Sequence, residues 1–397
     1  MKKNLKLAFI ITHPIQYYAP LYRQLSKRQD IAVRIFFTWH NGTNDAMDYG
    51  FKKNISWDIP LADGYEHELV PNCSSHPGSH HFMGINNPSL IKSVMKWNPD
   101  AIHITGYAFL SNILALRAFH KLKIPILFRG DSHLLDKEGV WKKVLKKKVL
   151  KYIFNLPSAF LYVGKNNYNY FKYYGVHDEK LFYCPHSIDV ERFSTVSNLQ
   201  EKQAAKLRNE IGIKNNYKVL LFAGKFEKKK QPIQLMRAFS EISPANTIML
   251  MVGNGELEHE VKRMVAKFPE LFRLLPFQNQ SMMPVIYRLG DLFILPSAFR
   301  ETWGLAVNEA MACSRPVLAS DRVGCATDLI IPGKTGEIFK AYNWGSFKNK
   351  LISLLHNPNH LKEMGKNARD HISNYTFEKT VSTLLAALKI LHNKGIH

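Results

Sequence analysis

Residues 292–312 read LFILPSAFRETWGLAVNEAMA, and this stretch decides the expected fold. It begins with four apolar residues, continues through a loop that starts with Pro296 and Ser297, and ends in a largely apolar segment from Leu305. A short, continuously apolar strand that leads into a helix is typical of a parallel sheet covered by helices on both faces. The stretch therefore predicts an α/β protein.

The same alternation of strand and helix recurs along the chain. Expected strands lie at 7–11, 31–37, 101–104, 124–128, 159–163, 218–223, 247–252, 272–275, 292–295 and 316–319. Expected helices lie at 18–27, 89–96, 112–121, 232–242, 257–267 and 306–313. The sequence predicts two Rossmann-like, doubly wound domains at 1–195 and 217–375, with a linker at 196–216 and a cleft between the domains.

The composition limits the classes of partner. The chain of 397 residues carries 54 Lys and Arg against 32 Asp and Glu, a formal net charge of +22. This charge indicates a polyanionic partner, and a hydrophobic fraction of 46% excludes a disordered basic tail. No apolar run reaches the ~20 residues of a membrane span, and the run at 7–11 is too short for a signal peptide. We expect a cytoplasmic protein that is at most peripheral on the inner face of the membrane.

The loop after the expected strand at 218–223 is a candidate phosphate site, because doubly wound sheets bind ligands at the carboxyl ends of their strands. It holds Gly224, Lys225 and Lys230. The glycine allows the backbone to approach a ligand, and the two ammonium groups can neutralise a diphosphate. The alternative is a solvated basic turn.

The loop after 292–295 leads to two glutamates eight residues apart, Glu301 in the loop and Glu309 among apolar helix residues. Eight helical residues rise ~12 Å, roughly the span from the sugar to the ribose of a nucleotide sugar. Glu309 would bind the ribose and Glu301 the sugar hydroxyls. Backbone N–H groups between them would face the diphosphate, and they belong to Thr302, Trp303, Gly304 and Leu305. The alternative places Glu309 on an exposed helix face.

Two nucleotide motifs fail. Residues 253–255, Gly-Asn-Gly, follow a strand and open a helix, but Glu258 replaces the third glycine of a dinucleotide fingerprint. Residues 333–335, Gly-Lys-Thr, resemble the end of a P-loop, but Asp328 stands where the upstream glycine is needed. We therefore expect neither a nicotinamide site nor a Walker site.

Residues 218–340 resemble the C-terminal domain of the retaining, GT-B-fold glycosyltransferases of family 4, the glycosyl transferases group 1. The shared elements follow the family's order: Gly224, Lys225 and Lys230; Gly253-Asn254-Gly255; Pro296-Ser297; Glu301; Glu309-Ala-Met-Ala312; Arg315-Pro316-Val317; Gly324 to Asp328; and Gly333 to Gly336. Lys225 departs from the family's usual arginine, which keeps the charge but loses the bidentate fork. The N-terminal half matches weakly, apart from 185–193, which resemble the interdomain segment.

The resemblance implies two Rossmann-like domains and a metal-independent retaining transferase. The implied enzyme requires no cofactor and uses a nucleoside diphosphate-sugar as a co-substrate. The implied catalytic residues are Lys225, Lys230 and Glu301. The implied donor-binding residues are Gly224, Lys225, Lys230, Gly253, Asn254, Glu301, Thr302, Trp303, Gly304, Leu305 and Glu309. The terminal helix, 376–397, is expected to pack back on the first domain.

Polar residues also follow the expected strand at 124–128. Arg129, Asp131 and His133 surround a glycine there and correspond by position to the loop in which the family usually places a histidine near the donor sugar. With His13, they are candidate contacts on the acceptor or donor-sugar side. The alternative is a capped helix start, with Asp131 or Ser132 as the N-cap.

A loop with one cysteine and three histidines suggests a metal site. Its residues are Cys73, His76, His80 and His81, but their spacing matches no zinc motif, and we expect no metal. The four cysteines of the chain form no C-x-x-C pair, which suits a reducing compartment.

Residues 140–156 form the clearest expected amphipathic helix. Apolar residues recur at helical spacing, namely Trp141, Val144, Leu145, Val149, Tyr152 and Ile153, and lysines cover the other side. Such a helix can lie on an anionic membrane. The alternative is a helix whose apolar face covers the sheet while its lysines face water.

The activity that the resemblance implies is transfer of a hexosyl-type sugar to a hydroxyl of a lipid-linked or saccharide acceptor, with retention, in cell-surface polysaccharide or glycolipid synthesis. The chain contains no D-x-D motif, which agrees with a metal-independent site. Two alternatives stay open: a glycoside hydrolase that uses Glu301 and Glu309, and a basic nucleic-acid-binding protein. No nucleic-acid-binding motif supports the latter, and we expect no nucleic-acid partner.

Overall fold

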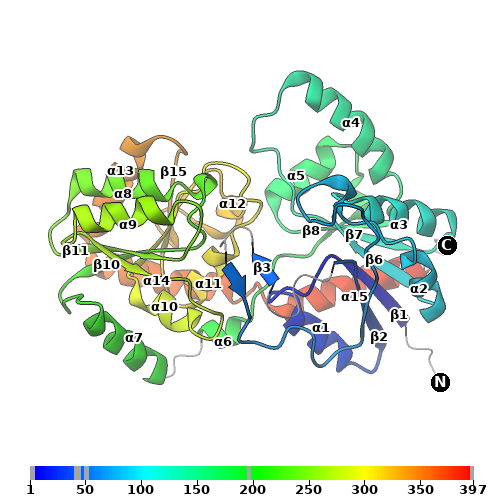
Figure 1. Ribbon diagram of the computed structural model, residues 1–397, viewed down its shortest axis with the longest axis horizontal. Coiled ribbons are helices and arrows are strands. Elements are labelled where there is room, and N and C mark those ends of the chain that lie inside the picture. Colours follow the sequence, from blue (N-terminus) through cyan, green and yellow to red (C-terminus); the bar gives the residue numbers. More distant parts are fainter. Residues whose placement is uncertain (1–4, 40–45, 49–52, 195–197, 394–397) are drawn as a thin grey trace. The chain divides into compact units, whose positions relative to one another are not determined.

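The computed structural model describes residues 5–39, 46–48, 53–194 and 198–393 (Figure 1). The chain divides into two compact units, each built from discontinuous segments. The first unit comprises Met1–Ala46, Ile59–His186 and Phe377–His397, and the second comprises Met47–Asp58 and Ser187–Thr376.

The first unit is built on a seven-stranded sheet in the order β5-β2-β1-β6-β7-β8-β9, in which neighbouring strands run parallel. The strands are β1 (Leu5–Ile11), β2 (Ile31–Phe37), β5 (His67–Leu69), β6 (Ala101–Thr105), β7 (Ile126–Arg129), β8 (Ala159–Tyr162) and β9 (Leu181–Tyr183). The α-helices are α1 (Ala19–Ser26), α2 (Leu90–Trp97), α3 (Leu110–Lys121), α4 (Val140–Phe154), α5 (Lys165–Tyr173) and α15 (Phe377–Asn393). Two short 3₁₀ turns, η1 (Phe82–Gly84) and η2 (Asp178–Lys180), complete this unit.

The second unit has a six-stranded parallel sheet in the order β12-β11-β10-β13-β14-β15. Its strands are β10 (Lys218–Ala223), β11 (Thr247–Val252), β12 (Phe272–Leu275), β13 (Leu292–Leu295), β14 (Val317–Ser320) and β15 (Gly336–Phe339). Its helices are α6 (Val190–Ser194), α7 (Asn198–Glu210), η3 (Lys228–Lys230), α8 (Pro232–Ile242), α9 (Glu258–Lys267), α10 (Met283–Leu289), α11 (Leu305–Ala312), α12 (Ala326–Leu329), α13 (Trp344–His356) and α14 (Pro358–Ile372). A separate ribbon pairs β3 (Ala46–Asp48) with β4 (Lys53–Ile55).

The apolar strands form the centre of each unit, and helices cover the sheets. In the first unit, Ile102 of β6 and Phe128 of β7 share a buried cluster with Phe119 of α3. In the second, Phe222 of β10 belongs to the cluster that contains Phe239 of α8. The predicted α/β fold class with two doubly wound parallel sheets is thus confirmed.

Both sheets reverse their strand order at one position, between β1 and β6 in the first unit and between β10 and β13 in the second. Such a switch point leaves a crevice at the carboxyl ends of the two strands, because their connections leave toward opposite sides. The loops after β10 and β13 are those that the sequence marks as functional.

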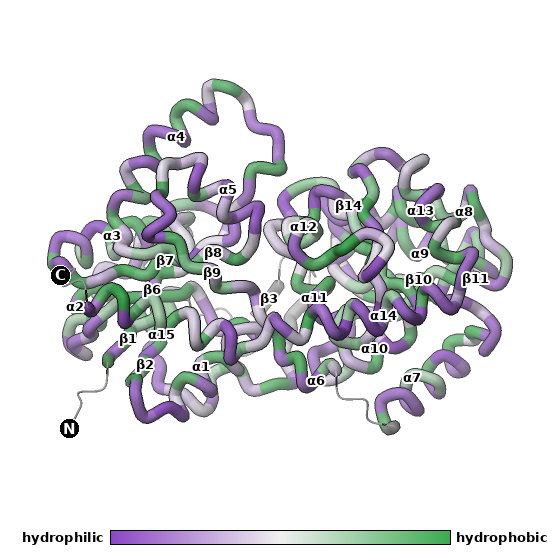
Figure 2. Tube along the Cα trace, turned by 180° about the vertical axis from the view of Figure 1, so that it is seen from behind, coloured by the Kyte–Doolittle hydropathy of each residue, from purple (hydrophilic) through white to green (hydrophobic). Residues whose placement is uncertain are grey.

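The described part of the expected linker, 198–216, contains a helix. Residues 198–210 form α7, which is largely hydrophilic (Figure 2) but belongs to the second unit. Arg208 of this helix lies 2.7 Å from Asp291, and Glu201 lies 3.2 Å from the buried guanidinium of Arg288. The sequence pattern did not reveal these ion pairs because their partners lie more than 80 positions away.

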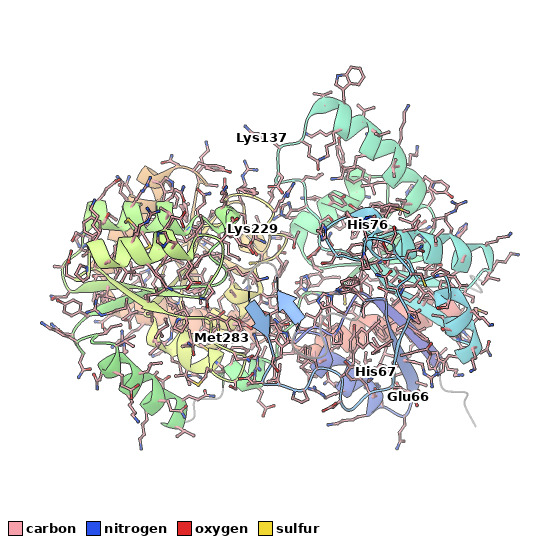
Figure 3. All side chains as sticks on the ribbon, viewed as in Figure 1. Glu66, His67, His76, Lys137, Lys229 and Met283 are labelled. Carbon is pink, nitrogen blue, oxygen red and sulfur yellow. The ribbon has the colours of Figure 1, made fainter. Side chains whose placement is uncertain are left out.

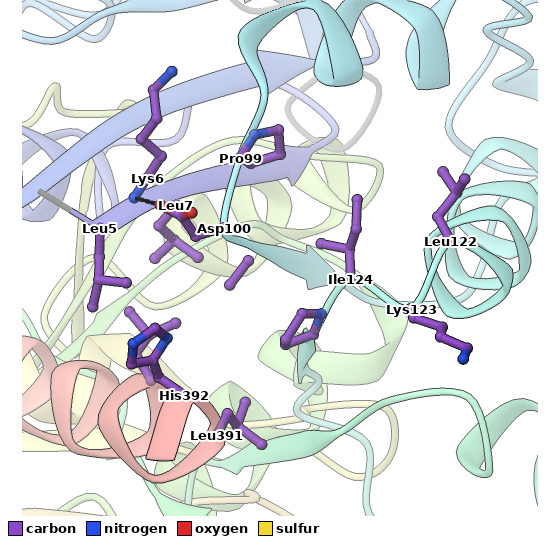
Figure 4. Close-up of a pocket in the computed structure, with 13 residues that line it drawn as sticks. Leu5, Lys6, Leu7, Pro99, Asp100, Leu122, Lys123, Ile124, Leu391 and His392 are labelled. Atoms are coloured by element: carbon purple, nitrogen blue, oxygen red, sulfur yellow. Dashed lines mark hydrogen bonds between the residues drawn. The ribbon is translucent and has the colours of Figure 1, made fainter. Parts of the chain in front are cut away.

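A pocket of about 360 Å³ opens at the amino ends of β1, β6 and β7 in the first unit (Figure 4). The backbone N–H of Lys6 donates to the Asp100 carboxylate there at 2.8 Å. The pocket lies at the edge of the sheet opposite to the loop that follows β7, so it is separate from the candidate residues at 129–133.

Candidate active site

The candidate site lies at the switch point of the second sheet, where the loops after β10 and β13 meet. The two strands pair directly, with Leu220 opposite Leu292, so their carboxyl ends lie side by side. The N–H of Ala298 donates to the carbonyl of Lys229, labelled in Figure 3, at 2.8 Å. This hydrogen bond ties the two loops together.

Lys230 and Glu301 form the central ion pair of the site. The Lys230 Nζ atom lies 2.6 Å from Oε2 of Glu301, with side chains 13% and 12% exposed. The Ser297 hydroxyl donates to the same oxygen at 2.8 Å. Burial raises the pKa of Glu301, but the charge and hydrogen bond of Lys230, helped by the charge of Lys229 and by Ser297, hold that pKa below its ordinary value. Glu301 is therefore a carboxylate at neutral pH.

Two glycines border this ion pair. A Cβ atom at Gly224 would lie 3.6 Å from Cδ of Lys230, and one at Gly304 would lie 3.6 Å from Cγ of Glu301. Gly304 has a φ of 96° and precedes α11, whose start has no side-chain cap. The structure thus brings together Gly224, Lys230, Glu301 and the start of α11 at Leu305, where uncapped backbone N–H groups favour an anion. Lys225 is half-buried in the same loop.

A second loop holds the backbone of the segment around Glu301. The N–H of Gly324 donates to the Glu301 carbonyl and that of Cys325 to the Trp303 carbonyl, each at 2.9 Å. A Cβ atom at position 324 would lie 1.8 Å from the carbonyl oxygen of Thr302, so only glycine permits this approach. The Trp303 indole is buried and does not face outward, because its N–H donates to Asn308 at 2.8 Å. For Trp303, only the backbone can serve the expected donor contact.

Glu309 lies in the interior, on α11. It is 2% exposed, and its Oε2 accepts a 2.6 Å hydrogen bond from the hydroxyl of Tyr287 on α10. The alternative that Glu309 is an exposed helix residue is therefore wrong. Tyr287 was missed by sequence reasoning, because 22 positions separate the two residues and no motif joins them.

Gly253 and Asn254 support the loop after β10. A Cβ atom at Gly253 would lie 2.0 Å from the carbonyl oxygen of Gly224. Asn254 is buried, donates to Glu258 at 2.6 Å and accepts from the N–H of Phe277 at 2.6 Å. These contacts show that both residues position the loop after β10, and the direct donor contact that the resemblance implies stays a prediction.

In the first unit, Arg129 ends β7 and points into the interior. It is 4% exposed and donates to the carbonyls of Cys184, at 2.9 Å, and Pro185, at 3.3 Å. Burial, together with the nearby charge of Arg129, lowers the pKa of His103 to about 3, so this histidine is neutral. The guanidinium therefore holds the backbone at Cys184 and Pro185, and the expected contact between Arg129 and substrate stays a prediction.

The other candidates of the first unit lie nearer the surface. Asp131 is partly exposed, 3.9 Å from Nε2 of His186, and His133 Nδ1 accepts from the N–H of Leu135 at 3.3 Å. The alternative of a capped helix start at Asp131 or Ser132 is wrong, because α4 begins only at Val140. His13 is half-buried after β1 at the same edge of the sheet.

The loop with Cys73 and three histidines makes local contacts. His81 Nε2 lies 2.9 Å from the carbonyl of His76, and the His76 ring contacts Ser75 at 3.1 Å. Within the described part of the chain, no three His, Cys, Asp or Glu side chains gather in a way that could hold a metal ion.

Comparisons with known proteins point to one family. Residues 203–371 match the family model of the glycosyl transferases group 1. A D-inositol 3-phosphate glycosyltransferase 2 of Catenulispora acidiphila is 28% identical over 209 residues, 49% of this chain and 47% of the relative. An uncharacterized glycosyltransferase of Methanocaldococcus jannaschii is 26% identical over 344 residues, 83% of this chain and 88% of the relative. Matches to the D-inositol 3-phosphate glycosyltransferases span about half of their length, 47% and 42% in two cases.

The fold is similar to that of Anabaena HepE, solved in complex with UDP and glucose. The TM-score is 0.71 at 17% identity, and the match covers 98% of this chain and 100% of that one. At this identity the similarity concerns the fold alone, and it confirms the two-domain GT-B architecture.

Proposed function

We propose that the chain, whose residues 203–371 match the family model of the glycosyl transferases group 1, transfers a hexosyl-type sugar from a nucleoside diphosphate-sugar to a hydroxyl with retention of anomeric configuration. The observation that carries the proposal is the Lys230–Glu301 ion pair of 2.6 Å at the switch point of the second sheet. It supplies a cation and a carboxylate at the edge where doubly wound sheets bind nucleotides.

The difficult step of this reaction is the departure of the diphosphate. Negative charge develops on the leaving oxygen, and fixed positive groups that face it lower the barrier. Lys230 supplies one such charge, and the uncapped start of α11 at Leu305 supplies partial positive charge from its N–H groups. Lys225, half-buried in the same loop, is proposed to contact the second phosphate. No metal and no cofactor is required for this charge balance.

Glu301 is proposed to bind hydroxyls of the transferred sugar. Its pKa lies below the ordinary value because Lys230 and Ser297 stabilise the charged form against burial. A charged carboxylate is a strong acceptor for sugar hydroxyls. Glu309 is proposed to bind the ribose, with Tyr287 holding its carboxylate in place at 2.6 Å.

We propose a front-side displacement. The bond between the anomeric carbon and the diphosphate oxygen breaks, and a bond from that carbon to the acceptor oxygen forms on the same face. The proton of the acceptor hydroxyl passes to the departing diphosphate. This balance needs no covalent intermediate on a side chain, and a trapped glycosyl-enzyme would contradict it.

The glycoside hydrolase alternative is disfavoured by the state of Glu301. A hydrolase needs one carboxylic acid with a raised pKa to protonate its leaving group. The pKa of Glu301 is lowered, and Glu309 is buried with a tyrosine hydroxyl on its Oε2. The Glu301 carboxyl group is therefore not prepared to act as the general acid.

The acceptor side is proposed from the first unit. Asp131, His133 and His13 lie at the carboxyl edge of its sheet and are candidate contacts for a lipid-linked or saccharide hydroxyl. Cell-surface polysaccharide or glycolipid synthesis on the cytoplasmic face of the membrane is the process that such an acceptor suits.

Donor binding can be tested by thermal unfolding of the wild type with UDP-, GDP- and ADP-sugars. We expect the sugar nucleotides of one base to raise the unfolding temperature of the wild type. Lys230→Ala and Glu309→Ala should abolish this shift. Lys228→Ala is the matched control, because Lys228 lies in the same loop but is exposed. If both site variants responded like the wild type, the donor site would lie elsewhere.

A further inference from the structure

Helix α4 exposes most of its apolar side chains, against the alternative of a helix whose apolar face covers the sheet. Only Leu150, Ile153 and Phe154 of its 15 residues are buried. Trp141 is 88% exposed and Leu145 67%. The other exposed apolar residues on α4 are Val140, Val144, Val149 and Tyr152. By contrast, α3 buries Ala115, Leu116 and Phe119 with only 12 residues.

The lysines of α4 accompany this apolar surface. Residues 137–154 contain seven lysines and one acid, Glu138. Glu138 lies 2.8 Å from Lys146, whose ammonium group also lies 5.5 Å from the Tyr170 ring and faces the body of the unit. Lys142, Lys143, Lys147, Lys148 and Lys151 are exposed. Hydrophobic and hydrophilic residues follow each other along the helix (Figure 2).

We propose that the exposed surface of α4, residues 140–152, docks on an anionic lipid bilayer. Tryptophan and leucine beside lysines are the side chains that interfacial helices place at the boundary of headgroups and acyl chains. Lysines close to an anionic surface add attraction that salt screens. None of the described helices combines the length and apolarity needed to cross a membrane.

The observations favour a bilayer over two other occupants. A second copy would bring the same lysines against this surface, and like charges would repel. A nucleic acid would pair with the lysines but would leave Val140, Leu145 and Val149 in water. Of these three occupants, an anionic bilayer provides both negative charge and a place for these apolar side chains.

The position of α4 connects this surface with the proposed acceptor loop. The chain runs from the end of β7 through Asp131 and His133, then through Lys137 (labelled in Figure 3), and enters α4 at Val140. On the premise of the proposed transferase function, docking of α4 would hold this loop beside a lipid-borne hydroxyl. The inference therefore names the acceptor as membrane-anchored.

The test is flotation of the full chain with vesicles of phosphatidylcholine, pure or with about one third phosphatidylglycerol. We expect binding only to the anionic vesicles, and a loss of at least about tenfold in Trp141→Ser/Leu145→Ser. Lys142→Gln/Lys147→Gln should weaken binding by roughly 30-fold, because each lysine contributes about 1 kcal/mol at the surface. The matched controls are Leu199→Ser, at a residue 64% exposed on α7, and Lys362→Gln/Lys366→Gln on exposed positions of α14.

Three results would overturn the inference: no vesicle binding by the wild type, equal binding by the α4 variants, or tighter binding to RNA or DNA than to vesicles with loss in the same variants. Nucleotide-induced thermal shifts measured on the same proteins separate this inference from the donor site. The α4 variants should keep the wild-type shift. Loss of vesicle binding alone concerns the membrane surface, whereas a missing nucleotide shift in the wild type concerns the proposed function.

Discussion

The Nζ atom of Lys230 lies 2.6 Å from Oε2 of Glu301, although 71 positions separate the two residues. The ion pair joins the loops that follow β10 and β13, the two strands at the switch point of the second sheet. It keeps a cation and a carboxylate in place before any ligand arrives. The Lys230 and Glu301 side chains are thus already ordered, and binding of a nucleotide sugar there would not have to immobilise them.

Replacement of Lys230 by alanine should lower kcat by about 100-fold or more, because the leaving diphosphate loses a fixed positive charge. The change should also reduce the free energy of unfolding by about 3 kcal/mol, since Glu301 remains buried without its cation. Initial rates of nucleoside diphosphate release and urea unfolding measure the two effects. Lys228→Ala, at an exposed lysine of the same loop, should leave both unchanged. If the Lys230→Ala enzyme kept the wild-type kcat, the catalytic role proposed for Lys230 would be contradicted.

The stability contribution of Glu301 should depend on pH. Its pKa in the folded chain lies below the ordinary value of 4.5, because Lys230 and Ser297 outweigh the effect of burial. The folded state therefore gains stability at pH above about 4.5, and this gain is lost as the pH falls through the lower, folded-state pKa. Urea unfolding of wild type and Glu301→Gln should differ most near neutral pH and converge in acid. Glu363→Gln, at an exposed glutamate, should show no such convergence. If the difference in the free energy of unfolding between wild type and Glu301→Gln grew in acid, the stabilising ion pair between Lys230 and Glu301 would be contradicted.

Tyr287→Phe tests whether the Tyr287 hydroxyl fixes the position of the Glu309 side chain. It removes the hydroxyl that donates to Oε2 of Glu309 at 2.6 Å and leaves a buried carboxylate with one donor fewer. We expect a loss of about 1–3 kcal/mol in the free energy of unfolding and a raised KM for the donor. Thermal unfolding and donor titrations measure these effects. Tyr342→Phe, at an exposed tyrosine, is the control. An unchanged KM would limit Tyr287 to a structural role.

Gly253→Ala should separate the loop after β10 from the loop after β11. The added Cβ atom would lie 2.0 Å from the carbonyl oxygen of Gly224, so one backbone segment must move. We expect destabilisation by more than about 3 kcal/mol, together with loss of the nucleotide-induced thermal shift. In Gly139→Ala the new Cβ atom meets nothing within 4 Å, and this variant should behave like the wild type. Full nucleotide binding by Gly253→Ala would show that the close approach is dispensable.

Arg129→Lys should destabilise the first unit by about 1–3 kcal/mol, because lysine cannot reproduce the guanidinium contacts with the carbonyls of Cys184 and Pro185. The donor-induced thermal shift, which belongs to the second unit, should persist. Arg117→Lys, at an exposed arginine of α3, is the control. A stable Arg129→Lys variant with a raised acceptor KM would instead support the predicted contact between Arg129 and substrate.

The sequence predicted the central strands of both sheets and the edge strand β12, but it missed the edge strands β5, β9 and β15. Strands such as β10 and β13 are continuously apolar because helices cover both faces, so their pattern is visible in the chain itself. The edge strands β5 and β9 have three residues each, none of them buried, and are too short to give a clear strand pattern. The sequence predicted a linker where helix α7 lies because the surface of α7 is polar. The ion pairs that attach α7 to the second unit involve residues far away in the sequence.

By itself, the sequence determined the fold class, the position of the loops after β10 and β13, and the residue types in them, because strand and helix periodicity and motif spacing are local properties of the chain. Tertiary structure decided which of those residues meet. In the folded chain Lys230 forms an ion pair with Glu301, and the Tyr287 hydroxyl donates to Glu309. Arg129 and Asn254 are buried, whereas Trp141 on α4 is exposed. These outcomes depend on packing between residues far apart in the chain, and packing leaves no periodic signal in the sequence.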